Sequence, residues 1–156
     1  MIVLRASEKI EVAVGDEKHR EGEVLDLLEA SYLAYTGRAM IIDENNKPLD
    51  LKQVFMKYAS GNLWWILFTV FTDLASRGRR IRKGFGERDI VVEHEGKKYM
   101  VYVTEEGAEI PVITLLTWIE SSQHKDMIPV IAVVDMYGDV TYYQATSMSL
   151  RKISYP

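Results

Sequence analysis

The segment FTDLASRGRRIRKGFGERD, residues 71–89, combines an amphipathic pattern, glycine breaks and a dense run of positive charge. Its first part has the spacing of the last turns of a helix, and Gly78 is placed to end that helix. Gly84 and Gly86 indicate a turn. The apolar residues that begin at Ile90 then predict a strand. The segment therefore predicts a helix that leads into a sheet through a basic connection.

The positive charge of this segment is concentrated between positions 77 and 83. Five of the 19 Lys and Arg residues lie there, namely Arg77, Arg79, Arg80, Arg82 and Lys83. The chain as a whole has a formal charge of −4, so any function of this basic run would be local. One interpretation is a solvated loop without a ligand. The other is contact with a phosphate backbone or with an acidic partner surface.

Composition restricts the class of protein. A chain of 156 residues suffices for one ordinary domain or two small ones, and its 47% hydrophobic and 27% charged residues are normal for a globular protein. The absence of cysteine excludes disulfides and thiolate metal sites. The three histidines, His19, His94 and His124, lack the close spacing of a metal site, and we expect His19 to be exposed. Neither a metal nor a cofactor is predicted.

The hydrophobic pattern gives an expectation for localisation. The most apolar run, residues 63–70, is too short to span a bilayer. The N-terminal segment has no secretory pattern, because charged residues interrupt its apolar stretch. We therefore expect a cytoplasmic protein without a membrane partner.

Two small domains are predicted, over residues 1–60 and 61–156, because Ser60, Gly61 and Asn62 interrupt the helical pattern. In the first, periodicity predicts an α/β domain with strands over residues 2–4, 9–14 and 39–42, and helices over residues 24–35 and, capped by Asp50, 51–58. In the second, it predicts helices over residues 63–76 and after Pro111, and strands over residues 90–93, 99–103, 128–134 and 140–146. This order is typical of an α/β module with a mixed sheet.

The sequence predicts which residues are buried in two elements of the second half. The helix after Pro111 is expected to turn one face to the core, formed by Val112, Leu115, Leu116 and Ile119. The strand over residues 128–134 is almost continuously apolar. It is therefore expected to lie in the centre of the sheet, covered on both faces.

Common catalytic motifs are absent from the sequence. There is no GxxxxGK phosphate loop and no GxGxxG dinucleotide motif. Asp89 could begin a metal-dependent nuclease site, but the strand over residues 99–103 supplies neither a carboxylate nor a lysine at its centre. A metal-free ribonuclease needs a base, an acid and a cation, and the one cluster of that kind is His94 with Lys97, Lys98 and Tyr99. An ordinary polar turn explains the same cluster.

Several segments, in order, resemble the archaeal tRNA-splicing endonucleases. In the second half they are FTDL, RG, KGFG, Asp89, VIAVVD and GDVTYY, at residues 71–74, 77–78, 83–86, 89, 130–135 and 138–143. In the first half, LDLLEASYL at residues 25–33, followed by Gly37, is similar to a helix of the family's N-terminal domain. The resemblance covers most of the chain and rests on the order and spacing of the motifs.

The resemblance implies a fold and a reaction. The fold would be α/β (α+β), with a small mixed N-terminal domain followed by a restriction-endonuclease-like C-terminal domain that contains a mixed sheet. The reaction of the family would be metal-independent cleavage of precursor tRNA, which leaves a cyclic phosphate and a 5′ hydroxyl and needs no cofactor.

The sequence departs from the active members of this family at the positions that carry the chemistry. Those members have a catalytic Tyr at the end of the strand after the FG turn, a His three residues before the Tyr of the next strand, and a Lys just before the apolar strand. Here the corresponding positions hold Val92 or Glu93, Gly96, and one of Met127, Ile128 and Pro129. The resemblance thus implies no catalytic residue in this chain, and a structural subunit in a heterotetramer of two catalytic and two structural chains.

The resemblance also implies where such a subunit meets its partner. The residues concerned are Asp135, Tyr137, Gly138, Asp139, Tyr142 and Tyr143. The loop over residues 135–139 would insert into a basic pocket of another subunit, and the strand over residues 140–146 would pair edge to edge with its dimer partner. Without the resemblance, the same residues are explained by an ordinary hairpin turn and a tyrosine-rich core strand.

Precursor tRNA is the substrate that the resemblance implies. Arg77, Arg79, Arg80, Arg82 and Lys83 would position its phosphates without reading its sequence. Two alternatives remain open at this point. One is an active ribonuclease that uses His94 in a shifted register, and the other is a tRNA-binding protein that works without a partner.

Overall fold

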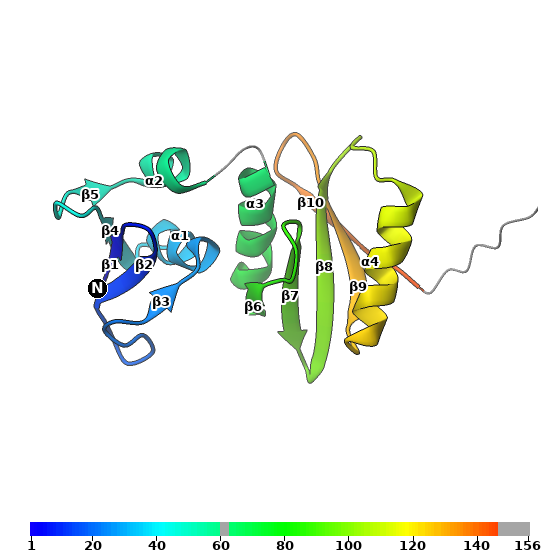
Figure 1. Cartoon of the computed structure of the whole chain (residues 1–156), viewed down its shortest axis with the longest axis horizontal. Helices are drawn as coiled ribbons and strands as arrows, with labels where there is room; N and C mark the ends of the chain where they lie inside the picture. The colour runs from blue at the N-terminus through cyan, green and yellow to red at the C-terminus, as the bar shows by residue number, and fades with distance from the viewer. Residues whose placement is uncertain (60–62, 147–156) are drawn as a thin grey trace, which may run out of the picture. The chain divides into compact units, whose positions relative to one another are not determined.

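The computed structural model describes residues 1–59 and 63–146. The chain divides into two units, Met1–Arg77 and Gly78–Pro156 (Figure 1). The boundary predicted at residues 60–62 lies outside the described residues. Among the described residues, every helix is too short or too polar to cross a lipid bilayer.

The first unit is built on a five-stranded sheet in the order β3-β2-β1-β4-β5. Its strands are β1 (Ile2–Ala6), β2 (Ile10–Val14), β3 (Val24–Leu25), β4 (Ala39–Ile42) and β5 (Pro48–Leu49). The pairing of β1 with β4 is parallel and the other pairings are antiparallel, so the sheet is mixed. Alternate residues of β1 and β2 enter the core, as the period-two pattern predicts.

The helices of this unit begin at aspartate caps. Asp50 caps α2 (Leu51–Tyr58) as predicted, in a reciprocal capping box with Gln53. The helix predicted over residues 24–35 begins later than expected, as α1 (Leu27–Tyr35). The Asp26 side chain accepts a hydrogen bond from the Glu29 amide at 2.9 Å and so starts the helix there, while β3 pairs with β2.

The third helix, α3 (Leu63–Ser76), packs on α1 and α2 through aromatic rings. The ring centroids of Phe55 lie 5.6 Å from Trp64 and 5.2 Å from Phe68, and Tyr32 lies 5.7 Å from Phe71. Such edge-to-face pairs stabilise a core beyond their buried area. The helix over residues 63–76 is therefore confirmed, and it belongs to the first unit.

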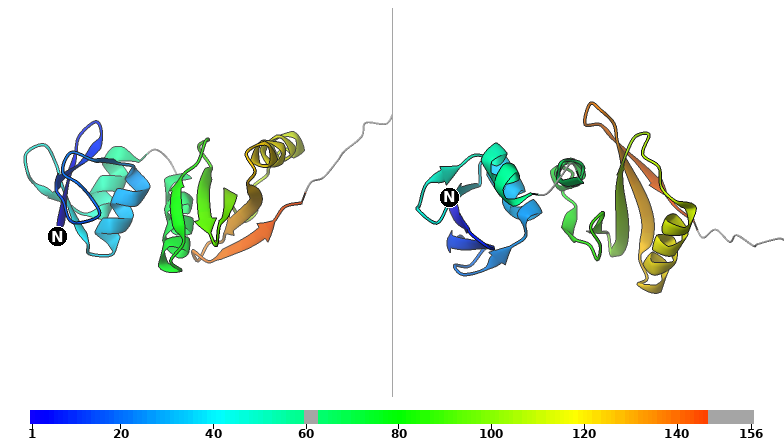
Figure 2. Two further views of the ribbon diagram at one scale, coloured as in Figure 1. Left: turned by 90° about the horizontal axis from the view of Figure 1, so that it is seen from below. Right: turned by 45° about the horizontal axis from the view of Figure 1, so that its top comes forward.

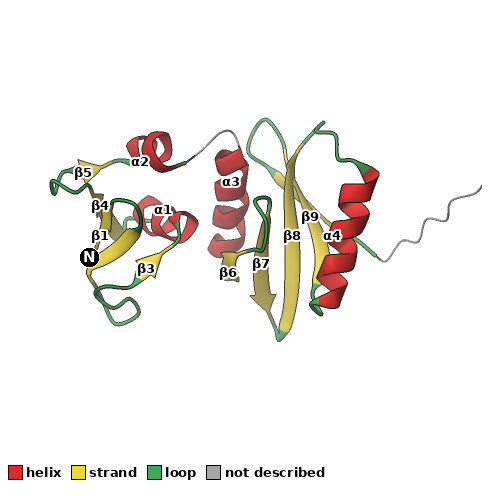
Figure 3. Ribbon diagram, in the orientation of Figure 1, coloured by secondary structure: helices red, strands yellow, loops and turns green. Residues whose placement is uncertain are grey.

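The second unit contains a five-stranded sheet in the order β10-β9-β8-β7-β6 (Figures 1 and 3). Its elements are β6 (Arg80–Lys83), β7 (Asp89–His94), β8 (Lys97–Glu105), α4 (Val112–His124), β9 (Ile128–Val134) and β10 (Val140–Gln144). The parallel pairing of β8 with β9 requires a crossover, which α4 supplies on one face of the sheet (Figure 2). The prediction of an α+β fold with mixed sheets is confirmed.

Three expectations for this unit are wrong in detail. The basic run was expected as a connection, but residues 80–83 pair with β7 and form an edge strand. The strand over residues 128–134 is next to an edge, and residues 128, 130, 131 and 133 are only partly buried. Within α4, Val112 is exposed, and the buried residues are Trp118, Ile119 and Ser122. The physical reason is that Val112 lies in the first turn, whereas the middle of α4 packs on β7 and β8.

Candidate functional site

The turn between β6 and β7 is organised by a buried carboxylate. Asp89 is 5% exposed, and its side chain accepts hydrogen bonds from the amides of Gly86 at 2.6 Å and Phe85 at 3.4 Å. A Cβ atom on Gly84 would lie 2.5 Å from the backbone oxygen of Asp89, so only glycine fits at this position. The hydrogen bonds to Asp89 and the close approach at Gly84 thus define the backbone of the KGFG turn, on which the Phe85 side chain is exposed.

We expect Gly84→Ala to lower the free energy of unfolding by about 1–3 kcal/mol, because its methyl group would clash with the backbone of Asp89, which is fixed by the strand pairing. Chemical denaturation followed by circular dichroism measures this loss. Gly86→Ala is the matched control, since its Cβ would meet only the Asp89 side chain, at 3.3 Å, and should cost less. Unchanged stability of the Gly84 variant would contradict the close approach of the backbone.

The predicted basic run does not form one patch. Arg77 follows α3, and its Nε lies 3.3 Å from a carboxylate oxygen of Asp73, one turn earlier. On β6, Arg80 and Arg82 lie opposite Glu93 and Val91, whereas Lys83 lies opposite Ile90. Alternation therefore directs the two arginines to the face of the sheet that α4 covers, and Lys83 to the other face. Arg79 is partly buried just before the strand.

The three positions predicted to replace the catalytic residues of the family, taken at Val92, Gly96 and Ile128, lie at one end of the second sheet. Val92 pairs with Tyr99, and Tyr99 pairs with Ile128, so these three residues form one row across β7, β8 and β9. Gly96 occupies the β7–β8 turn beside this row, with a φ of 76°. Val92, Gly96 and Ile128 offer no group that transfers a proton or carries a charge, whereas Glu93, the alternative to Val92, directs its side chain to the other face of the sheet.

The alternative cluster around His94 is partly assembled. His94 lies opposite Lys97, and alternation puts Tyr99 on the same face of the hairpin. Lys98 lies opposite Glu93 on the other face. The Nε2 atom of His94 is 3.5 Å from a carboxylate oxygen of Glu95. An imidazole, a lysine and a phenol therefore share one face, while the fourth residue of the predicted cluster does not.

The hairpin between β9 and β10 lies at the opposite end of the sheet from Gly96 (Figure 1). The Oδ1 atom of Asp135 accepts hydrogen bonds from the amides of Tyr137 and Asp139, each at 2.9 Å. Gly138 has a φ of 82°, which favours glycine. Met136 and Tyr137 are both 81% exposed. The turn is therefore fixed by one aspartate, and it presents an apolar pair at its tip.

The strand β10 forms one edge of the described sheet. The amide of Asp135 donates to the Asp139 oxygen, and the amide of Ala145 donates to the Pro129 oxygen. Odd-numbered residues of this strand therefore direct their backbone groups to β9, and the even-numbered residues, such as Gln144, direct theirs to the outer edge. Tyr143 exposes its side chain on the face that α4 covers, and Tyr142 lies on the other face.

The comparison with known proteins identifies the family. The family model "tRNA intron endonuclease, catalytic C-terminal domain" matches residues 64–142, from the first turn of α3 to the middle of β10. A tRNA-splicing endonuclease from Thermococcus kodakarensis is 32% identical over 133 residues, which cover 80% of this chain and 77% of the relative. This chain belongs to the tRNA intron endonuclease family.

Other relatives differ in length. A tRNA-splicing endonuclease from Methanococcus vannielii is 30% identical over 144 residues, which cover 86% of this chain and 80% of the relative. One from Methanococcoides burtonii is 29% identical over 137 residues, which cover 83% of this chain. The match spans only 38% of that longer relative. The resemblance to archaeal tRNA-splicing endonucleases is thus confirmed at the level of the family.

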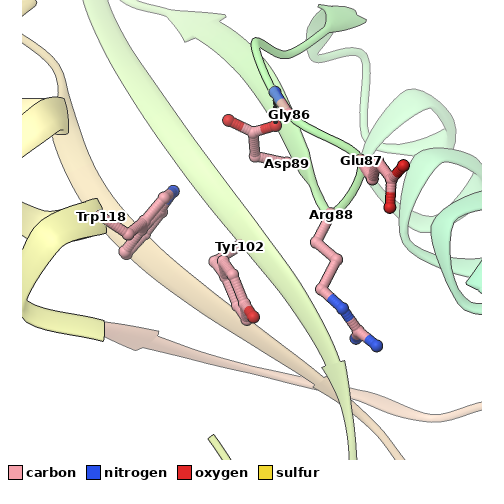
Figure 4. A pocket seen from close by; sticks show the side chains of 6 residues that line it. All are labelled: Gly86, Glu87, Arg88, Asp89, Tyr102 and Trp118. Carbon is pink, nitrogen blue, oxygen red and sulfur yellow. Dashed lines mark hydrogen bonds between the residues drawn. The ribbon is translucent and has the colours of Figure 1, made fainter. Parts of the chain in front are cut away.

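The sequence did not predict a groove on the α4 side of the sheet in the second unit. Its residues come from the 85–89 turn, from β8 and from α4, and two adjoining cavities of about 300 and 490 Å³ share Gly86, Asp89, Tyr102 and Trp118 (Figure 4). The exposed Phe85 and Ile113 stand at its edges. No local pattern joins these segments, although Phe85 was visible in the sequence as an apolar residue inside a glycine turn.

One residue of the first unit differs from its prediction. His19 was expected to be exposed, but its side chain is only 12% exposed. Its Nε2 lies 3.2 Å from a carboxylate oxygen of Glu29, and its Nδ1 lies 3.4 Å from Asp16. The His19 amide also donates to Asp16, which lowers the pKa of that carboxyl. His19 therefore attaches its loop to α1, a structural role that the charged surroundings in the sequence concealed.

Proposed function

We propose that this chain is the structural, non-catalytic subunit of an archaeal tRNA-splicing endonuclease. It would assemble in the cytoplasm with a separate catalytic subunit, as two chains of each kind, to cut introns from precursor tRNA. The observation that carries this proposal is the row of Val92, Tyr99 and Ile128, with Gly96 beside it. Val92, Gly96 and Ile128 offer no base, acid or cation, which supports a chain without a part in the chemistry.

The missing groups each have a chemical consequence. A metal-independent ribonuclease needs a base to activate the 2′ hydroxyl, an acid to protonate the leaving oxygen, and a cation to stabilise the charge on the phosphate. Glu93 follows Val92 on β7 but directs its side chain to the other face of the sheet, opposite Lys98, and no acid stands at Gly96. In this proposal the second unit therefore binds partner subunits and precursor tRNA and does not catalyse the cleavage.

Two surfaces support an assembly role. The hairpin at residues 135–139 is held by two backbone hydrogen bonds to Asp135 and lies at one end of the sheet, and β10 presents backbone groups at an edge of the sheet that the structure describes. In the proposed complex, the hairpin enters a partner subunit and β10 pairs with the corresponding strand of its dimer partner. The Asp135 carboxylate is occupied by hydrogen bonds within its own turn. In the proposed interface the negative charge therefore comes from Asp139, and the exposed Met136 and Tyr137 supply apolar contact.

The RNA contacts in this proposal are electrostatic. Arg80 and Arg82 extend from an edge strand on one face, and Lys83 from the other, so the β6 edge carries three cations within reach of a phosphate backbone. Arg77 and Arg79 would contribute at the beginning of this strand. Precursor tRNA is the ligand, and its sequence is not read by these contacts.

The test is cleavage of an intron-containing precursor tRNA in EDTA, by this chain alone and then mixed with a catalytic subunit. Cleavage only after mixing is the expected result. Cleavage by the purified chain alone would overturn the proposal, because it would require catalytic groups other than the residues at positions 92, 96 and 128.

A second candidate function is metal-independent cleavage by this chain itself. The observation in its favour is that His94, Lys97 and Tyr99 share one face of the β7–β8 hairpin. A third candidate, a tRNA-binding protein without an obligate partner, predicts a stable monomer or homodimer whose tRNA affinity falls steeply with salt.

We expect His94→Ala to leave the cleavage rate of the assembled complex within about twofold of the wild type, since the proposed function gives His94 no proton to transfer. The rate of precursor cleavage at saturating complex measures this. Lys97→Ala is the control for lost positive charge on the same hairpin face. A drop of about 100-fold or more with His94→Ala, in a complex that still assembles, would favour the second candidate.

A further inference from the structure

The first sheet carries apolar side chains on both of its faces. Alternate residues of β1 and β2, such as Leu4 and Val12, pack with α1 and α2 in the core on one face (Figure 2). The open face, on the side away from these helices, carries Val14, Val24 and Met40, which are 54%, 53% and 42% exposed. A sheet with one face in water usually alternates apolar core residues with polar outer residues. The open face departs from this pattern and has the composition of a face that a partner covers.

Strand register places three apolar residues in one row across the open face. Val3 on β1 pairs with Val14 on β2 and with Met40 on β4. A bulge in the β1–β2 ladder brings Val14 opposite Val3. Three neighbouring strands therefore present a continuous apolar strip, of the kind that two packed sheets bury between them.

The next row of the open face carries two opposite charges on adjacent strands. Arg5 on β1 pairs with Glu11 on β2, and Glu11 pairs with Val24 on β3. The Nη2 atom of Arg5 donates to the Oδ1 atom of Asn46 at 3.1 Å, and the Nζ atom of Lys9 lies 2.9 Å from the Oε1 atom of Glu11. Both contacts are exposed and therefore weak, so each charge can bind a second partner.

This distribution of charged and apolar residues is complementary to itself under a two-fold rotation. An axis parallel to the strands, midway between β1 and β2, turns a second sheet over and lays its β2 on β1 of the first copy. Arg5 of each copy then meets Glu11 of the other, and Val3 of each copy meets Val14 of the other. The strands β3 and β4 likewise exchange places across the axis. The charge pattern therefore favours a second copy of this chain, whereas a face with charge of one sign would need a different partner.

We propose that two copies of this chain associate through the open face of the first sheet. The two sheets pack face to face, about 10 Å apart, with their strands aligned. The apolar row forms the centre of the contact, and the Arg5–Glu11 pairs fix its register. This contact goes beyond the proposed function, because it belongs to the first unit, whereas the 135–139 hairpin and β10 belong to the second.

The size of the open face predicts a reversible dimer. Strands lie about 4.8 Å apart and residues rise about 3.3 Å along a strand, so a face of five strands, the longest of five residues, covers roughly 400 Å². A stable interface of standard size uses about 800 Å² on each partner. The dimer therefore forms in proportion to the concentration of the chain and is not obligate.

Charge reversal on the full chain tests this contact. Every chain in the experiment also carries Gln144→Pro, which blocks any pairing through β10. Arg5→Glu should raise the dissociation constant of the dimer at least about tenfold, because both symmetric contacts then bring two carboxylates together, and Glu11→Arg should do the same with two guanidinium groups. Sedimentation velocity over a range of concentrations measures the dissociation constants. Lys52→Glu is the matched control, since it reverses an exposed charge on α2 and should leave the dissociation constant unchanged.

A mixture of the two variants separates a lost contact from a damaged fold. When the Arg5→Glu chain meets the Glu11→Arg chain, both contacts again join opposite charges. A heterodimer should therefore form at concentrations where neither variant dimerises alone, and native mass spectrometry distinguishes it by mass from either homodimer. The double variant, which carries both reversals in one chain, should dimerise as the chain with Arg5 and Glu11 does.

The contrary outcomes separate this contact from the proposed function. If the Gln144→Pro chain remains a monomer at every concentration measured, or if the mixed variants give no heterodimer, the contact is wrong, and the cleavage test of the structural subunit is unaffected. If Arg5→Glu weakens assembly with the catalytic subunit and spares self-association, the open face binds a different protein and the inference is overturned.

Discussion

Precursor tRNA incubated with this chain alone in EDTA should remain uncut, and addition of a catalytic subunit should produce both tRNA halves and the intron. We expect the rate with the chain alone to be at least roughly 10⁴-fold lower than with the complex, because general acid–base catalysis contributes about 10² to 10⁴ and several groups are missing together. Single-turnover cleavage, followed on denaturing gels, measures both rates.

The physical reason lies in the row across β7, β8 and β9. Val92 and Ile128 flank Tyr99, and Gly96 forms the turn beside them, so the three positions predicted to replace the catalytic residues offer no group that can exchange a proton. The catalytic subunit alone is the necessary control, since it shows whether the structural chain contributes to the rate. Cleavage by this chain alone that survives EDTA and disappears with His94→Ala would replace the proposed function with the second candidate.

Gln144→Pro should prevent the edge-to-edge pairing of β10 with its dimer partner, and should weaken the assembly at least about tenfold. The backbone amide of residue 144 points to the outer edge of the sheet, so proline removes a hydrogen-bond donor there and puts its ring in the path of an incoming strand. The β9–β10 ladder is spared, because its bonds use the odd-numbered residues. Sedimentation of the mixed subunits over a range of concentrations measures the change in assembly.

Gln144→Ala is the matched control, since it keeps the backbone amide and removes only the exposed side chain. It should assemble as the wild type does. A complex that forms equally well with Gln144→Pro would show that the outer edge of β10 is not a subunit contact, and would leave the 135–139 hairpin as the surface to test next.

Local features of the chain were predictable because they depend on residues close in sequence. Asp50 caps α2 through hydrogen bonds within one helical turn. Gly138 and Asp135 build a hairpin turn from neighbouring backbone groups. Apart from β6, the order of helices and strands in the second half followed from periodicity, and the order of its motifs led to the family.

The secondary-structure predictions were wrong for segments whose conformation depends on pairing with strands elsewhere in the sequence. Residues 80–83 carry a charged pattern that periodicity treats as a loop, yet they become a strand because β7 offers an unpaired edge. Residues 24–25 have the apolar spacing of a helix, yet they pair with β2 before the Asp26 cap. In both cases hydrogen bonds to another strand outweigh a weak local preference.

The sequence by itself determined the family and the mixed α+β architecture, and it predicted that the catalytic side chains of active members are replaced. Only the tertiary structure decided that Val92 and Ile128 lie in one row with Gly96 beside it, that Asp135 is occupied within its own turn, and that Arg80 and Arg82 lie on the other face of the sheet from Lys83. It alone assembled the groove of Phe85, Tyr102 and Trp118. The reason is that residue types and their spacing can be read directly from the sequence. Strand register and the packing of α4 on the sheet, in contrast, bring together segments that are distant in the sequence and share no local pattern.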